Sequence, residues 1–166
     1  MSLQHKLKWC FKNGEKGERH KGLKKIEISD EKIKGHLDKA IHNFKAMIVF
    51  QKSGFSDWSA SAAFYCLYHC LLALLAKEGY ESRNQNCTFI LIEDMIDKKK
   101  ISLTKEDLKE IFDTDIIEDL EHSSKILDIR ENMQYSIKTY LEQKEFLEMK
   151  ERTKMLFDKL RLDLEK

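Results

Sequence analysis

The sequence predicts an all-α protein, an up-and-down bundle of four to five helices around one buried central helix. Three observations lead to this fold class. Residues 58–76 contain no Asp, Glu, Lys or Arg, although 36% of the chain is charged. Stretches on both sides of this segment carry apolar residues at helical spacing. No stretch shows the convincing alternation of apolar and polar residues that is typical of a half-buried strand.

The central helix is expected over residues 57–79. It is apolar on all sides, and a helix of this kind is normally buried. Ser56 or Asp57 is expected to cap its start, and Gly79 to end it, as a glycine just past a helix commonly does. The uncharged segment approaches the length that spans a bilayer, but its hydroxyl and imidazole groups would be costly in hydrocarbon. We therefore expect a helix in the core of a soluble protein, with no membrane contact.

The chain divides into a basic N-terminal arm, residues 1–28, and a single helical-bundle domain, residues 29–166. Residues 1–25 carry eight Lys or Arg and two Glu, whereas the net charge of the whole chain is +1. We interpret the arm as a solvated, mobile terminus, with a phosphate-contacting arm as the alternative. Trp9 and Phe11 within it are expected to dock on the bundle, because an exposed aromatic pair is unusual in a monomer.

The first helix of the bundle is expected to be capped by Ser29 or Asp30 and to end at Gly54. A short helix opened by Asn86 or Thr88 is expected to follow the central helix and to end near residue 96.

Thr104 and Asp107 resemble a capping box at the start of the next short helix. Five acids and no base lie in residues 113–121. Asp115 is expected to begin a long late helix that continues to about residue 141. A last helix follows, after a break near Lys144.

The four cysteines lack paired spacing and favour a reducing cytosol over a disulfide scaffold. The first residues also lack the apolar core of a signal peptide, so a cytoplasmic protein is expected. Cys66, His69 and Cys70 lie within one helical turn, but a structural zinc site needs four ligands. We predict no metal site and no cofactor.

Arg130 is the most informative polar residue of the late helix. It lies in line with the apolar Met133 and Ile137, so an acid, a phosphate or backbone carbonyls must satisfy its five N–H donors. Two interpretations stay open: an ion pair with the acids of residues 113–121, or contact with a phosphate in a groove.

Several segments, in order, resemble the HEPN domain (higher eukaryotes and prokaryotes nucleotide-binding). The central helix has the DW start, the AAFYCLYH core and the LLALLAKEGY end of that family. The segment SRNQNCT at residues 82–88 is similar to a loop that often reads SxNHxCT in archaeal and bacterial members. WCF at residues 9–11 and RHKGL at residues 19–23 resemble the lead-in of the same subgroup. The resemblance covers about residues 9–140.

This resemblance implies a bundle of four or five helices that is commonly dimeric. Many members are RNases or toxins, often paired with a minimal nucleotidyltransferase antitoxin. Their catalytic signature, an Arg, a polar residue, three variable residues and a His, falls on Arg130, Glu131 and Tyr135. Tyr135 stands at the histidine position, and Gln85 stands at the position of the loop histidine. A phenol with a pKa near 10 shuttles protons poorly at neutral pH, so the motif is degenerate and binding is favoured over catalysis.

The leading hypothesis is therefore a homodimeric, cytoplasmic HEPN-like module that binds a nucleotide, RNA or a partner protein through a groove near Arg130. The predicted binding residues are Arg130, Glu131, Tyr135, Asn84, Gln85, Tyr65 and His69. One alternative is a toxin-type, metal-independent endoribonuclease that uses Arg130 with Tyr135 or His69. Another is a purely structural partner of a nucleotidyltransferase in a toxin–antitoxin pair.

Overall fold

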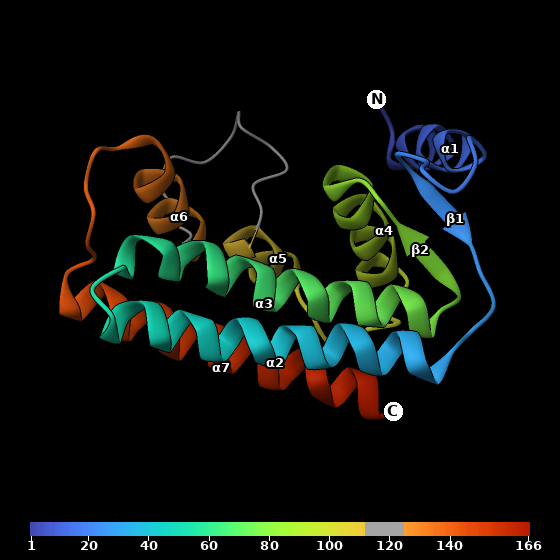
Figure 1. The fold of residues 1–166 in the computed structure, drawn as a ribbon. Helices are drawn as coiled ribbons and strands as arrows, with labels where there is room; N and C mark the ends of the chain where they lie inside the picture. Colours follow the sequence, from blue (N-terminus) through green and yellow to red (C-terminus); the bar gives the residue numbers. More distant parts are fainter. Residues whose placement is uncertain (112–124) are drawn as a thin grey trace.

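The structure of the chain is a computed structural model that describes residues 1–111 and 125–166. The prediction of an all-α bundle is confirmed (Figure 1). In chain order the elements are α1 (Leu3–Gly14), β1 (Leu23–Lys25), α2 (Asp30–Lys52), α3 (Ser56–Lys77), β2 (Tyr80–Ser82), α4 (Gln85–Asp97), α5 (Lys105–Ile111), α6 (Lys125–Tyr135) and α7 (Gln143–Glu165).

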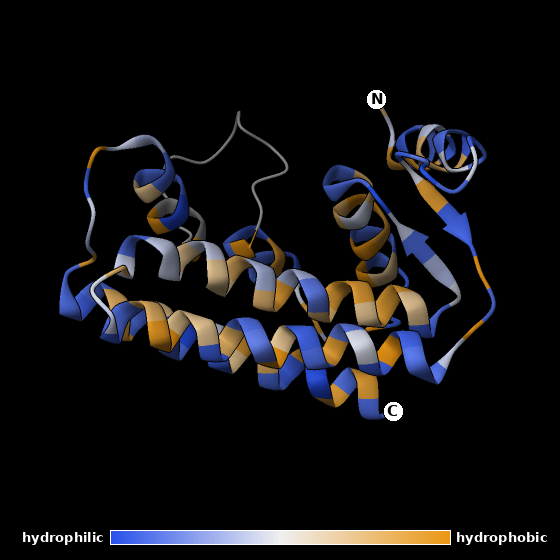
Figure 2. Ribbon diagram, in the orientation of Figure 1, coloured by the Kyte–Doolittle hydropathy of each residue, from blue (hydrophilic) through white to orange (hydrophobic). Residues whose placement is uncertain are grey.

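Helix α3 is the centre of the bundle, as its composition predicts. It contacts α2, α4, α5, α6 and α7. Helices α2 and α7 run along one side of it, and α4, α5 and α6 lie on the other side (Figure 1). Hydrophobic colouring extends along most of α3, whereas α2 and α7 alternate between hydrophobic and hydrophilic residues (Figure 2). Within the described ranges, α3 alone is long and apolar enough to cross a membrane, and 78% of its most apolar window is buried inside the protein. It is therefore a core helix.

Helices α2 and α3 end just before the predicted glycines, but the predicted cap at the start of α3 is wrong. Ser29 caps α2, and its hydroxyl accepts a hydrogen bond from the amide of Lys32. Gly54 and Gly79 follow α2 and α3 with φ of +83° and +82°, a conformation that glycine adopts at little cost. No side chain caps the start of α3. The hydroxyl of Ser56 instead accepts a hydrogen bond from the amide of Leu141, which ties α3 to the segment before α7.

The caps of α4 and α5 test two further predictions. Asn84, rather than Asn86 or Thr88, caps α4, and its side-chain oxygen accepts a hydrogen bond from the amide of Cys87. The capping box at α5 is confirmed. The amide of Thr104 donates to the carboxylate of Asp107, and the amide of Asp107 donates to the hydroxyl of Thr104.

The predicted mobile arm is ordered, which corrects the first interpretation of residues 1–28. Helix α1 contacts α4, and β1 pairs antiparallel with β2, so that Leu23 lies opposite Ser82. These two short strands were missed because three residues are too few to show an alternating pattern. Phe11 docks as predicted, with its ring 5.8 Å from that of Tyr80, but Trp9 is 54% exposed.

The long late helix is interrupted. The predicted start at Asp115 and the acidic stretch of residues 113–121 lie outside the described residues. Helix α6 ends at Tyr135, six residues before the predicted end, and α7 begins at Gln143, close to the predicted break. Ile137 was placed on the buried stripe, yet it is fully exposed. The helical register that the stripe assumes does not continue beyond Tyr135, so the later apolar residues do not share its face.

Candidate functional site

Arg130 projects from α6 onto the central helix. Its guanidinium carbon lies 3.7 Å from the centre of the Phe64 ring, a distance typical of a strong cation–π contact. The Arg130 side chain is half-buried, whereas Phe64 is fully buried. In the part of the chain that the structure describes, no carboxylate forms an ion pair with Arg130. The alternative partner, the acidic stretch of residues 113–121, lies outside the described residues.

Phe64 belongs to an aromatic cluster on α3 that also contains Tyr65 and Tyr68. The rings of Phe64 and Tyr68 stack, with centres 5.7 Å apart, and Tyr65 meets Phe64 edge to face. Tyr68 is buried, which raises the pKa of its phenol, and its hydroxyl is hydrogen-bonded to the hydroxyl of Thr88 on α4. Tyr65 is 40% exposed. The cluster therefore joins Arg130 on α6 to the start of α4 and presents one ring to solvent.

The remaining motif residues of α6 do not share the direction of Arg130. Five residues along a helix correspond to about 140° of rotation around its axis, so Arg130 and Tyr135 point to different sides. Tyr135 is 81% exposed, and Glu131 is exposed as well. The structure does not bring the Tyr135 phenol to the Arg130 guanidinium.

Asn84 and Gln85 lie at the start of α4. Asn84 has a structural role there: besides capping α4, its side-chain amide donates to the backbone carbonyl of Lys21 at 3.5 Å. The hydroxyl of Thr88 donates a hydrogen bond to the backbone carbonyl of Asn84. Thr88 therefore links the aromatic cluster to the N-cap of α4. Gln85 is half-buried in the first turn.

His69 pairs with a histidine of α2 rather than with Arg130. Its Nδ1 atom lies 3.2 Å from Nδ1 of His36, and the two rings stack with centres 5.4 Å apart. Burial, then His36 and then Lys39 lower the pKa of His69 to about 4. Burial, followed by Lys39, also lowers the pKa of His36. Both imidazoles are therefore neutral at pH 7, and His69 is a poor source of protons there.

These two lowered pKa values predict a loss of stability in acid. The pKa of His69 falls from 6.5 in the unfolded chain to about 4 in the fold, so between these pH values the unfolded state binds more protons. The melting temperature should fall as the pH drops through this window. A His36→Gln/His69→Gln variant should lose less than wild type, while His42→Gln, at an exposed position of α2, should behave like wild type. Equal slopes for all three proteins would contradict the coupling.

The two cysteine thiols of α3 are unreactive packing groups. Cys66 and Cys70 are both fully buried, and burial raises the pKa of Cys66 to about 12 and that of Cys70 well above its usual value. Across residues 1–111 and 125–166, no group of three or more His, Cys, Asp or Glu is arranged to hold a metal ion.

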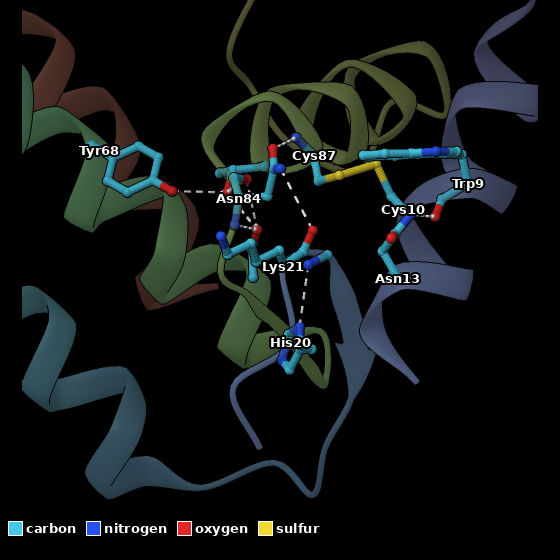
Figure 3. The surroundings of a disulfide bond; sticks show 11 residues. Trp9, Cys10, Asn13, His20, Lys21, Tyr68, Asn84 and Cys87 are labelled. Carbon is cyan, nitrogen blue, oxygen red and sulfur yellow. Dashed lines mark hydrogen bonds between the residues drawn. A yellow bond between two sulfur atoms is a disulfide. The ribbon is translucent and has the colours of Figure 1, made fainter. Parts of the chain in front are cut away.

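Sequence reasoning missed the bond between Cys10 and Cys87, and the prediction that favoured free cysteines is wrong for this pair. The two residues form a disulfide between α1 and the first turn of α4, with Cα atoms 5.7 Å apart (Figure 3). They are separated by 77 residues, and no local spacing links them. The cysteine content therefore no longer supports a reducing compartment.

His20 is a second structural residue that the sequence did not single out. It is almost fully buried, and its Nε2 atom lies 3.3 Å from the carboxylate of Glu81 on β2. Its Nδ1 atom accepts a hydrogen bond from the amide of Gly22. His20 therefore holds the connection between α1 and β1 against the bundle (Figure 3). The only sequence signal was its place in the RHKGL segment.

Comparison with known proteins supports the same fold family. The family model of the HEPN domain matches residues 33–162, which include all of α3 to α6 and most of α2 and α7. No curated protein matches the chain. Because the matched region covers most of the sequence and coincides with the observed helical bundle, the chain belongs to the HEPN domain family.

Proposed function

We propose that this HEPN module binds single-stranded RNA and that Arg130 contacts a phosphate of the strand. The observation that carries the proposal is the position of the guanidinium over Phe64. A cation–π contact uses the face of the ring and occupies none of the five N–H donors. These donors suit the bidentate recognition of a phosphate, for which arginine is better shaped than lysine.

The surroundings of Arg130 fit this ligand. The partly exposed Tyr65 belongs to the same aromatic cluster and offers a face on which a base can stack. These features favour a nucleotide strand over a small inorganic anion.

The test compares Arg130→Ala, Arg130→Lys and wild type in RNA titrations and thermal melts. Loss of a charge-assisted phosphate contact should weaken binding roughly 10- to 100-fold in Arg130→Ala. Arg130→Lys should fall between the two because it keeps the charge but loses the planar fork. The free energy of unfolding should change by only about 1 kcal/mol, the size of the lost cation–π contact.

Arg161→Ala is a suitable control, because Arg161 is an exposed arginine of α7. It should bind RNA like wild type. A loss of about 3–5 kcal/mol in Arg130→Ala, together with no saturable RNA binding by wild type, would show that Arg130 is part of a buried ion pair instead.

The same titration addresses the enzyme alternative. Degradation of the RNA by wild type but not by Arg130→Ala would establish an endoribonuclease. The lowered pKa of His69, its pairing with His36 and the exposed position of Tyr135 favour binding without cleavage. Pairing with a minimal nucleotidyltransferase in a toxin–antitoxin system stays a prediction of the family resemblance.

A homodimer is proposed as the assembled form, with the end of α6 at the interface. Tyr135, Ile137 and Tyr140 expose apolar surface in one short segment, and exposed apolar patches commonly mark protein interfaces. Sedimentation should give twice the chain mass of 19.7 kDa. Ile137→Lys should shift the protein to the monomer, whereas Lys154→Ala, at an exposed position of α7, should not. A wild-type mass near 20 kDa at micromolar concentrations would contradict the dimer.

A further inference from the structure

The segment that precedes the family match lines a groove together with β2 and α4. Two adjoining cavities, of about 380 and 700 Å³, share the side chains of Phe11, Glu15 and Tyr80. The first lies between α1 and α4, and the second between α1 and β1. We call them together the α1 groove. Both volumes are in the range of ligand-binding pockets.

The α1 groove is basic. Lys8 and Lys12 of α1 line the first cavity, and Lys24 and Lys25 of β1 line the second. All four lysines are exposed, and none of them forms an ion pair with a carboxylate in the described part of the chain. A fifth, Lys98, is paired with Asp94. The unpaired ammonium groups therefore outnumber the single unpaired acid of the shared wall, Glu15.

The wall shared by the two cavities is aromatic. The half-buried rings of Phe11 and Tyr80 are tilted by 60° with centres 5.8 Å apart, and each ring lines both cavities. Unpaired lysines on both sides of an aromatic wall are the two components with which proteins bind single strands: ammonium groups follow the phosphates, and rings stack on the bases. An acidic peptide would use the lysines but would gain little from the rings.

A disulfide and a strand pairing hold the α1 groove in shape. The Cys10–Cys87 disulfide fixes α1 to α4, and the β1–β2 pairing places Lys25 opposite Tyr80. The family match begins at residue 33, after both α1 and β1. Helices α1 and α6 lie at opposite ends of α3, so the groove is remote from Arg130 (Figure 1).

We infer that the α1 groove is a second binding site for single-stranded nucleic acid, with Lys8, Lys12, Lys24 and Lys25 on the phosphates and Tyr80 stacked on a base. This site does not depend on Arg130. A strand that bridges the two sites would pass along α3, whereas a single nucleotide would occupy one site only.

The first experiment measures fluorescence anisotropy of labelled RNA and DNA single strands of about 12 nucleotides, between about 50 and 200 mM salt. Lys8→Glu/Lys12→Glu should weaken binding at least about 10-fold, and the slope of log affinity against log salt should become shallower by about 1.4. The control Lys39→Glu/Lys45→Glu makes the same change of charge at exposed positions of α2. It should weaken binding less, and change the salt slope less, than Lys8→Glu/Lys12→Glu. An equal effect of the two double variants would overturn the site, because it would show a dependence on total charge alone.

The second experiment tests the stacking. Tyr80→Leu should weaken binding about 5-fold or more, while Tyr80→Phe should keep the wild-type affinity. Equal affinities for these two variants would overturn the assignment of a base to the groove. A loss of affinity for RNA alone would identify RNA as the ligand. An equal loss of affinity for DNA would show that phosphates and bases suffice for binding.

Arg130→Ala, measured in the same series, separates this inference from the proposed function. If only the Lys8/Lys12 and Tyr80 variants lose affinity, the α1 groove binds the strand and the role of Arg130 fails. If only Arg130→Ala loses affinity, the inference about the α1 groove fails. Loss in both supports both sites.

Discussion

Removal of the Cys10–Cys87 disulfide is expected to lower the free energy of unfolding by about 4.5 kcal/mol. The bond joins residues 77 positions apart, and in the chain-entropy model a loop of this length restricts the unfolded chain by about that amount. Urea unfolding of a Cys10→Ala/Cys87→Ala variant measures the effect. The same loss should appear when wild type is unfolded in the presence of a dithiol reductant.

Two controls belong to this experiment. The reductant should leave the Cys10→Ala/Cys87→Ala variant unchanged, because its remaining thiols, Cys66 and Cys70, are already free. Wild type that is denatured without reductant should show only these two reactive thiols, and all four after reduction. Four reactive thiols in the unreduced protein would show that the bond is absent.

Gly14→Ala should have an effect of similar size, at least about 3 kcal/mol, or should detach α1 from β1. A Cβ atom at Gly14 would lie 1.6 Å from the backbone carbonyl oxygen of Leu23, and a backbone atom cannot swing aside as a flexible side chain can. Thermal melts give the loss of stability, and hydrogen exchange of residues 3–25 shows whether the loss is local to α1 and β1.

Gly35→Ala is the matched control. Gly35 lies inside α2, and a Cβ there would meet no atom within 4 Å. Alanine also has the higher helix propensity, so this variant should gain about 0.5–1 kcal/mol. If Gly14→Ala were as stable as wild type, the close contact between the end of α1 and β1 would not exist in solution.

Local sequence patterns were sufficient for most of the bundle. The uncharged stretch of α3 made its burial predictable, because charged groups are rarely buried without partners. Ser29, Gly54 and Gly79 mark helix ends through interactions within a few residues, so their positions could be predicted as well. The resemblance to the HEPN family was also readable before any tertiary contact was known, and the family match over residues 33–162 confirms the family.

The site residues could be predicted only as single positions. Arg130 stood out because a cation on an apolar stripe needs a partner, but the partner that the structure gives it, the ring of Phe64, comes from another helix. Tyr135 was placed beside Arg130 by the spacing of a motif, whereas helical rotation and the end of α6 leave it exposed. His69 was predicted as a binding residue, but its partner in the structure, His36, is 33 residues away in the chain.

The sequence by itself determined most helices of the bundle, the central position of α3 and the basic character of the first 25 residues. Only the tertiary structure decided how those residues are used. A bond between Cys10 and Cys87, and the pairing of β1 with β2, depend on which distant surfaces meet when the bundle closes. The basic composition of residues 1–28 favoured a mobile arm, because composition gives the charge of a segment but not its contacts with distant parts of the chain. The docking of α1, by contrast, results from one covalent link and from a glycine contact that no local pattern encodes.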